Sequence, residues 1–219
     1  MIIFPASTIV DRSVPKNAFF NNMNINNRLR QDFTDKVKSI TWKAKFAPST
    51  LNVDDGKTVH EIVVFKMNLK KRDGFYDLLK FIDQMMPRHI VFILEYENNC
   101  LLLVNYKEGR DNERYDVIHT FQTEWMNEDE LSINLSGQDM DAIYSNLVRQ
   151  IAGTKITSSE RNLCLAIKQT CEQEQIRMRI TALERRIANE RQPRKKFELH
   201  QELKSLKDML GARQNHHNI

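Results

Sequence analysis

Apolar residues recur with helical spacing in three segments of the first two thirds of the chain. These segments are residues 27–39, 73–86 and 139–151. Apolar positions three and four apart line one face of an α-helix, so we expect three amphipathic helices. Pro87 and Gly153 are placed to end the second and third of them, since proline stops a helix and glycine is common just after one.

Other segments favour strands, because polar and apolar residues alternate or β-branched residues cluster. They are residues 41–46, 60–69, 90–96, 100–106 and 117–125. Residues 90–96 are apolar on both faces, which is typical of a doubly covered central strand. Asn98-Asn99 predicts a tight turn, and the charged residues 107–116 a loop. The order α-β-β-α-β-β-β-α predicts an α/β (α+β) fold, a mixed sheet flanked by helices.

The remaining N-terminal segment, residues 1–25, is rich in turn residues. We expect it to wrap the body of the protein, with a short helix near residues 18–20.

The last third of the chain predicts an antiparallel helical hairpin. Thr157 and Glu160 have capping-box spacing, so a long helix should begin there. Its apolar stripe is interrupted at Gln192-Pro193 and then resumes; the positions are Ile176, Ile180, Leu183, Ile187, Leu199, Leu203, Leu206 and Leu210. Two stripes joined by a short turn bury each other without a second chain.

The chain therefore divides into an α/β body, residues 1–153, and a C-terminal part, residues 154–219. We expect the first hairpin helix to be about twice as long as the second. Its N-terminal half then lacks a hairpin partner, so it docks on the body or, as the alternative, forms a homodimer interface. The tail after Gly211 is expected to be disordered.

Composition excludes several classes of protein. Hydrophobic residues make up 41% and charged residues 28% of the chain, as in an ordinary globular protein. The apolar runs are too short for a membrane helix, and no secretory signal is visible, so we expect a cytoplasmic protein without membrane contact. The three cysteines contain no C-x-x-C pair and favour free thiols.

Positive charge is concentrated at the end of the hairpin. Residues 177–196 contain eight basic and two acidic side chains, a net charge of +6 against +4 for the whole chain. We predict a nucleic-acid-binding surface formed by Arg185, Arg186, Arg191, Arg194, Lys195 and Lys196, because such clusters neutralise phosphates. Two alternatives stay open: the acidic surface of a protein partner, and a solvated face with some cations paired to Glu198 and Glu202.

A metal-dependent nuclease is the enzymatic alternative. Asp55-Gly56-Lys57 has acid-x-lysine spacing, and Glu61 begins the next strand on an otherwise apolar face. Asp55-Gly56 also reads as a turn, and no upstream acid completes the set. No nucleotide-binding, hydrolase or metalloprotease motif is present, and the histidines form no spaced ligand set. We therefore expect no metal and no cofactor.

One stretch resembles a known family. Residues 45–53, continuing through Gly56-Lys57, Glu61-Ile62 and Val64-Phe65, are similar to the bacterial domain-of-unknown-function family numbered forty-three ninety-one, as are Ile3-Phe4-Pro5 and residues 90–96. Its members tend to be encoded beside DNA methyltransferases and helicases of restriction-like defence systems. The resemblance implies an accessory role on DNA or on those enzymes, and it supplies no active-site residues.

The sequence thus favours a non-enzymatic accessory protein of a DNA-modification or phage-defence complex, in which the basic hairpin contacts DNA or RNA. The expected protein partner is a helicase or a DNA methyltransferase. The alternatives are a nuclease of such a system and a subunit that binds only protein.

Overall fold

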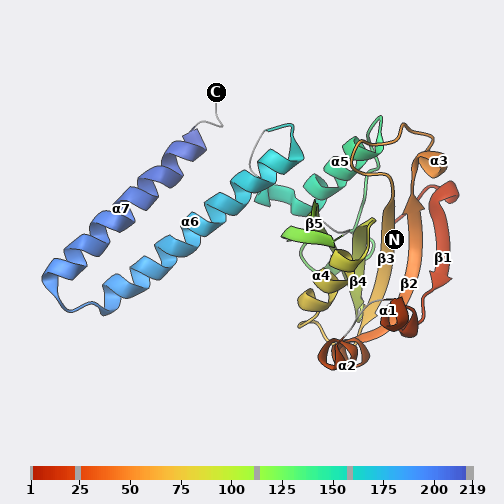
Figure 1. Ribbon diagram of the computed structural model, residues 1–219, viewed down its shortest axis with the longest axis horizontal. Helices are drawn as coiled ribbons and strands as arrows, with labels where there is room; N and C mark the ends of the chain where they lie inside the picture. Colours follow the sequence, from red (N-terminus) through yellow and green to blue (C-terminus); the bar gives the residue numbers. More distant parts are fainter. Residues whose placement is uncertain (1, 23–25, 111–113, 157–159, 216–219) are drawn as a thin grey trace. The chain divides into compact units, whose positions relative to one another are not determined.

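One mixed sheet organises the first part of the computed structural model, which describes residues 2–22, 26–110, 114–156 and 160–215 (Figure 1). Within these residues the sheet has seven strands: β1 (Ile9–Ser13), β2 (Val37–Phe46), β3 (Ile62–Leu69), β4 (His89–Tyr96), β5 (Asn99–Arg110), β6 (Arg114–Gln122) and β7 (Met126–Asn127). Strands β1 to β6 lie side by side in chain order, and β7 pairs with β5. The predicted mixed sheet with flanking helices is confirmed.

Helices connect and cover these strands. They are α1 (Lys16–Asn22), α2 (Asn27–Lys36), α3 (Pro48–Leu51), α4 (Tyr76–Met85) and α5 (Met140–Ala152), with short 3-10 turns at Ala6–Thr8 and Gly153–Lys155. Neighbouring strands pair antiparallel except β3 and β4, which are parallel. Parallel neighbours need a crossover connection, and α4 supplies it.

The core occupies both faces of the sheet. Leu101 and Leu103 of β5 pack in one cluster with Leu78 and Ile82 of α4. Leu102 points to the opposite face, because side chains alternate along a strand; there it borders a small cavity shared with Leu147 and Ile151 of α5. Residues 90–94 of β4 are all buried, as the expectation of a doubly covered central strand requires.

Several predicted boundaries in this part are wrong. Helix α4 begins at Tyr76 instead of Asp73, and β3 begins at Ile62 instead of His60, so Glu61 precedes the strand that it was expected to begin. The helix expected to reach Ser39 ends at Lys36, because Val37 takes an extended backbone and pairs with Leu69 of β3. The expected loop 107–116 is largely strand, since β5 and β6 continue pairing as far as Arg110 and Arg114. The strand expected to end at Trp125 ends at Gln122.

Asp139 caps α5 by accepting a hydrogen bond from the Ala142 amide, and Gly153 ends the helix with a positive φ of 54°. Both termini match the prediction. The first strand, β1, was missed.

The second part of the chain contains α6 (Leu163–Asn189) and α7 (Pro193–Asn215), which pack together as predicted (Figure 1, blue). The chain forms two compact units, Met1–Gly153 and Thr154–Ile219, and the hairpin belongs to the second. Leu183, Ile187 and Leu206 of the predicted stripes are buried in the hairpin. No helix in the described part of the chain is long and apolar enough to cross a membrane.

Three details of the hairpin differ from expectation. The predicted helix start falls on residues 157–159, which lie outside the described residues, and α6 begins only at Leu163, where Asn162 accepts a hydrogen bond from the Leu165 amide. The two helices have 27 and 23 residues, so the first is not twice as long. Helix α7 also continues through Gly211 to Asn215 instead of ending there; residues 216–219 lie outside the described part.

Candidate nucleic-acid interface

The closed end of the hairpin brings together all six cations that the sequence selected. Arg185 and Arg186 lie in the last turns of α6, and Arg191 lies in the connecting turn. The other three, Arg194, Lys195 and Lys196, lie in the first turn of α7. We call this set of six residues the basic apex. Pro193 is the first residue of α7, a position where its missing amide hydrogen costs nothing.

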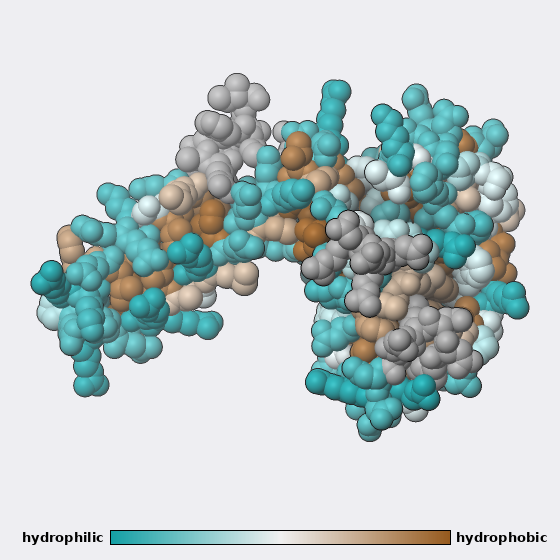
Figure 2. Space-filling model, viewed as in Figure 1, coloured by the Kyte–Doolittle hydropathy of each residue, from teal (hydrophilic) through white to brown (hydrophobic). Residues whose placement is uncertain are grey.

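Every side chain of the basic apex is exposed. Arg194 approaches Glu198 of its own helix at 3.5 Å, and both side chains are largely in solvent. Such a pair contributes roughly 0–1 kcal/mol. Among the described residues, the other five apex cations have no carboxylate oxygen within 4 Å. Figure 2 shows mostly hydrophilic side chains at this end of the hairpin, at the left of the view, with some apolar surface exposed between them.

The single acid within residues 185–196, Glu190, helps to shape the turn. Its Oε1 accepts a hydrogen bond from the Gln192 amide at 2.8 Å. That bond, followed by those of the Arg191 amide and the charges of Lys195 and Arg186, lowers the pKa of Glu190. Six cations and one anion leave a net charge of +5 over twelve residues. A shallow hollow lined by Arg185, Arg186, Asn189, Glu190 and Leu199 lies at this site.

Away from the apex, two ion pairs join the helices of the hairpin. Arg179 lies 3.7 Å from Glu202, and Lys207 lies 2.8 Å from Glu184. The sequence suggested Glu198 and Glu202 as partners on the facing helix. Glu202 of α7 does contact Arg179 of α6, whereas Glu198 contacts Arg194 of its own helix. These two ion pairs lie outside the basic apex, which keeps its net positive charge.

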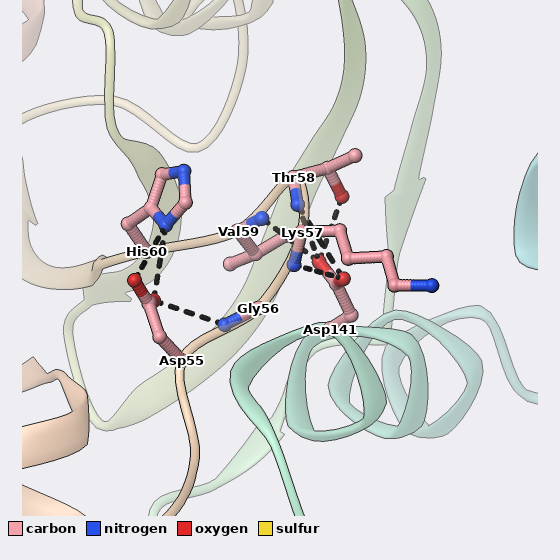
Figure 3. A network of polar contacts seen from close by, with 7 residues as sticks. All are labelled: Asp55, Gly56, Lys57, Thr58, Val59, His60 and Asp141. Carbon is pink, nitrogen blue, oxygen red and sulfur yellow. Dashed lines mark hydrogen bonds and ion pairs between the residues drawn. The ribbon is translucent and has the colours of Figure 1, made fainter.

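The residues of the nuclease hypothesis lie in the N-terminal unit and do not converge. Asp55 contacts Nδ1 of His60 at 3.0 Å and accepts a hydrogen bond from the Gly56 amide. Figure 3 shows the Lys57 ammonium group pointing away from Asp55. Glu61 is held by Lys45 at 2.8 Å and Arg88 at 2.7 Å. Each carboxylate thus has basic partners of its own.

No group of three or more His, Cys, Asp or Glu side chains in the described ranges is arranged to hold a metal ion.

The loop that carries Lys57 is built around Asp141, a residue that the sequence did not single out. The Asp141 carboxylate accepts hydrogen bonds from the amides of Lys57, Thr58 and Val59 at 2.6–3.1 Å, and from Oγ1 of Thr58 at 2.7 Å (Figure 3). Partial burial acts to raise the pKa of Asp141, but these hydrogen bonds outweigh it and lower the pKa. The loop is therefore fastened to the start of α5.

Over residues 2–210 the sequence matches the family described as Domain of unknown function (DUF4391). The chain belongs to this family. The resemblance noted in the sequence is thereby confirmed. No curated protein and no solved structure matches this DUF4391 chain.

The sheet of this DUF4391 protein also contains a buried ion pair. Lys107 of β5 lies 2.7 Å from Asp83 of α4, and both side chains are fully inaccessible to solvent. The Lys107 ammonium also donates to the carbonyls of Asp83, Met86 and Arg88 at 2.6–2.7 Å, so it satisfies the C-terminal end of α4. Burial raises the pKa of Asp83 to about 6 and lowers that of Lys107.

A polar relay continues from this pair across the sheet. Asn105 donates to Asp83 at 3.1 Å and accepts a hydrogen bond from Thr120 of β6 at 2.7 Å. The relay therefore joins α4, β5 and β6. These contacts are accounted for by structure, because Oδ2 of Asp83 accepts the hydrogen bond of Asn105 and Oδ1 has the Lys107 ammonium as its ionic partner at 2.7 Å.

Proposed function

We propose that this chain is a non-enzymatic accessory protein that binds nucleic acid through the basic apex. The observation that carries the proposal is a net charge of +5 over twelve residues, with all six cations exposed. Cations placed this way displace condensed counterions from a phosphate backbone, which gives affinity that depends on salt and little on sequence.

The distribution of charge over the two units supports the same proposal. Residues 154–219 contain 14 basic and 8 acidic side chains, a net charge of +6, whereas residues 1–153 have 19 basic and 21 acidic side chains, a net charge of −2. The hairpin unit therefore attracts a polyanion and the other unit does not. We assign to the N-terminal unit the contact with a protein partner, a helicase or a DNA methyltransferase of a modification or defence complex. That assignment rests on the family resemblance.

The test is a binding titration of the full chain with fluorescently labelled DNA and RNA. The apex variant carries Arg191→Glu, Arg194→Glu, Lys195→Glu and Lys196→Glu, a change of eight charge units. If the apex makes four phosphate contacts, raising salt from about 50 to about 200 mM weakens wild-type binding roughly 100-fold, and the apex variant loses that part of the affinity.

A matched control separates a local effect from one of net charge. Arg12, Arg28, Lys38 and Lys71 are exposed on the N-terminal unit, and changing all four to Glu alters the net charge by the same amount. We expect the control variant to lose far less affinity than the apex variant. Equal losses in the two variants, or a wild-type protein that binds no nucleic acid at low salt, reject the proposal.

A further inference from the structure

Phe197 is an exposed aromatic side chain near the start of α7, with 62% of its surface in solvent. Helix α7 packs on α6, and Leu199, Leu203 and Leu206 on one side of α7 are buried or half-buried. With roughly 100° per residue, Phe197 lies about 160° around the helix from Leu199, so it faces away from the seam. Burial of a phenylalanine side chain stabilises a fold, and this position forgoes most of that stabilisation. Packing of the hairpin does not account for a phenylalanine there.

One cation lies beside this ring, and two more belong to the same end of the helix. Arg194 precedes Phe197 by three residues and therefore lies on the same face of α7, whereas Lys195 and Lys196, two residues and one residue before Phe197, face other directions. Proteins that hold single strands combine these two features: basic side chains follow the phosphates, and an aromatic face stacks on a base. In a duplex the base faces are already stacked on one another, so an aromatic ring on a helix surface has no base face to meet.

We infer that Phe197 stacks on an unpaired base, so that the basic apex prefers single-stranded DNA or RNA to duplex. This inference rests on the proposed function, and it specifies the class of nucleic acid. Phosphate contact comes from the six apex cations and operates on either form. The preference for single strands comes from Phe197.

The experiment compares an unstructured oligothymidylate with a duplex of the same length, bound to the full chain at one fixed salt concentration. Stacking is worth about 1–3 kcal/mol per base, so Phe197→Ala should weaken single-strand binding about 5- to 150-fold and change duplex binding by less than about twofold. Phe197→Tyr should retain the single-strand affinity. Met209→Ala is the control, since Met209 is an apolar side chain of α7 that is also more than half exposed.

A spectroscopic signal tests the contact itself. In Phe197→Trp, the added indole should be quenched by oligothymidylate and not by duplex, beyond any change in the two native tryptophans. Equal losses for both nucleic acids in Phe197→Ala, or no loss for either, overturn the inference. If Phe197→Ala binds normally while the apex charge variant does not, the stacking role fails and the proposed function stands. Loss of a protein partner with intact single-strand binding assigns Phe197 to a protein contact instead.

Discussion

Replacing Lys107 by methionine should destabilise the N-terminal unit more than any other single lysine change in it. The substitution keeps most of the side-chain volume and removes the ammonium group, which serves one carboxylate and three carbonyls. Removing one partner of a buried ion pair costs about 3–5 kcal/mol, because the other charge stays buried without compensation. A typical domain has a total stability of about 5–15 kcal/mol, so this loss is a large part of it.

The structure also predicts an asymmetry between the two partners. In Asp83→Asn the ammonium keeps its three carbonyl acceptors, so the expected cost is about 1–3 kcal/mol. In Lys107→Met the carboxylate keeps only Asn105 and must take up a proton to remain buried. The double variant removes both charges, and its loss should be smaller than the sum of the single losses by about 0.5–3 kcal/mol.

Urea unfolding followed by tryptophan fluorescence measures these effects selectively. Both tryptophans, Trp42 and Trp125, lie in the N-terminal unit, so their signal reports its unfolding. Lys80→Met, at an exposed position of α4, is the matched control and should change stability by less than about 0.5 kcal/mol. A loss below about 1 kcal/mol in Lys107→Met, or a larger loss in Asp83→Asn, refutes the reasoning.

Further predictions concern His89 and Gly56 of the same unit, with Gly211 of the hairpin unit as a comparison for Gly56. Burial, followed by the charge of Lys107, lowers the pKa of His89 from 6.5 to about 4. The unfolded chain therefore binds a proton that the folded state excludes, so stability from the neutral ring is complete above about pH 6.5 and falls toward about pH 4. The wild type should lose about 3 kcal/mol in free energy of unfolding, relative to His89→Phe, as the pH falls from about 6.5 to about 4. A difference between the two proteins that stays constant over this range contradicts the lowered pKa of His89. Gly56→Ala places a Cβ 2.4 Å from the Val59 carbonyl oxygen and 2.8 Å from Asp141, so thermal unfolding should show a loss of about 1–3 kcal/mol. Gly211→Ala meets nothing within 4 Å and should stabilise α7 by about 0.5–1 kcal/mol; the same sign for both glycines argues against the close approach at Gly56.

The spacing of apolar residues, and the proline and glycine residues that interrupt it, predicted the parts of the fold that depend on local sequence. The leucine and isoleucine stripes on either side of Gln192-Pro193 predicted the hairpin, because a proline at that point and two matching apolar faces admit few other arrangements. Strand β1 escaped prediction since it is a polar edge strand: most of Ile9–Ser13 is exposed, and its pairing with β2 depends on backbone hydrogen bonds.

The buried polar groups were missed for a different reason. Lys107 was placed in a loop by its charged neighbours, although it continues the series Leu101, Leu103 and Asn105 on one face of β5. Asp83 lies four residues after Leu79, within the apolar stripe of α4. The available signal for the buried ion pair was a charged residue on the apolar face of β5 and another on the apolar stripe of α4. Their pairing depends on how α4 packs on the sheet, which a single sequence does not specify.

The most direct test of the central claim is the slope of log affinity against log salt for the wild-type chain and for variants in which apex cations are changed one at a time to glutamine. Each cation that contacts a phosphate should contribute about 0.9 to the slope on duplex and about 0.7 on single strands. Six phosphate contacts predict a slope near −5 on duplex and near −4 on single strands, and each substitution should reduce the slope by the contribution of one contact. A slope that is the same in the wild type and in a chain lacking all six cations contradicts phosphate binding by the basic apex.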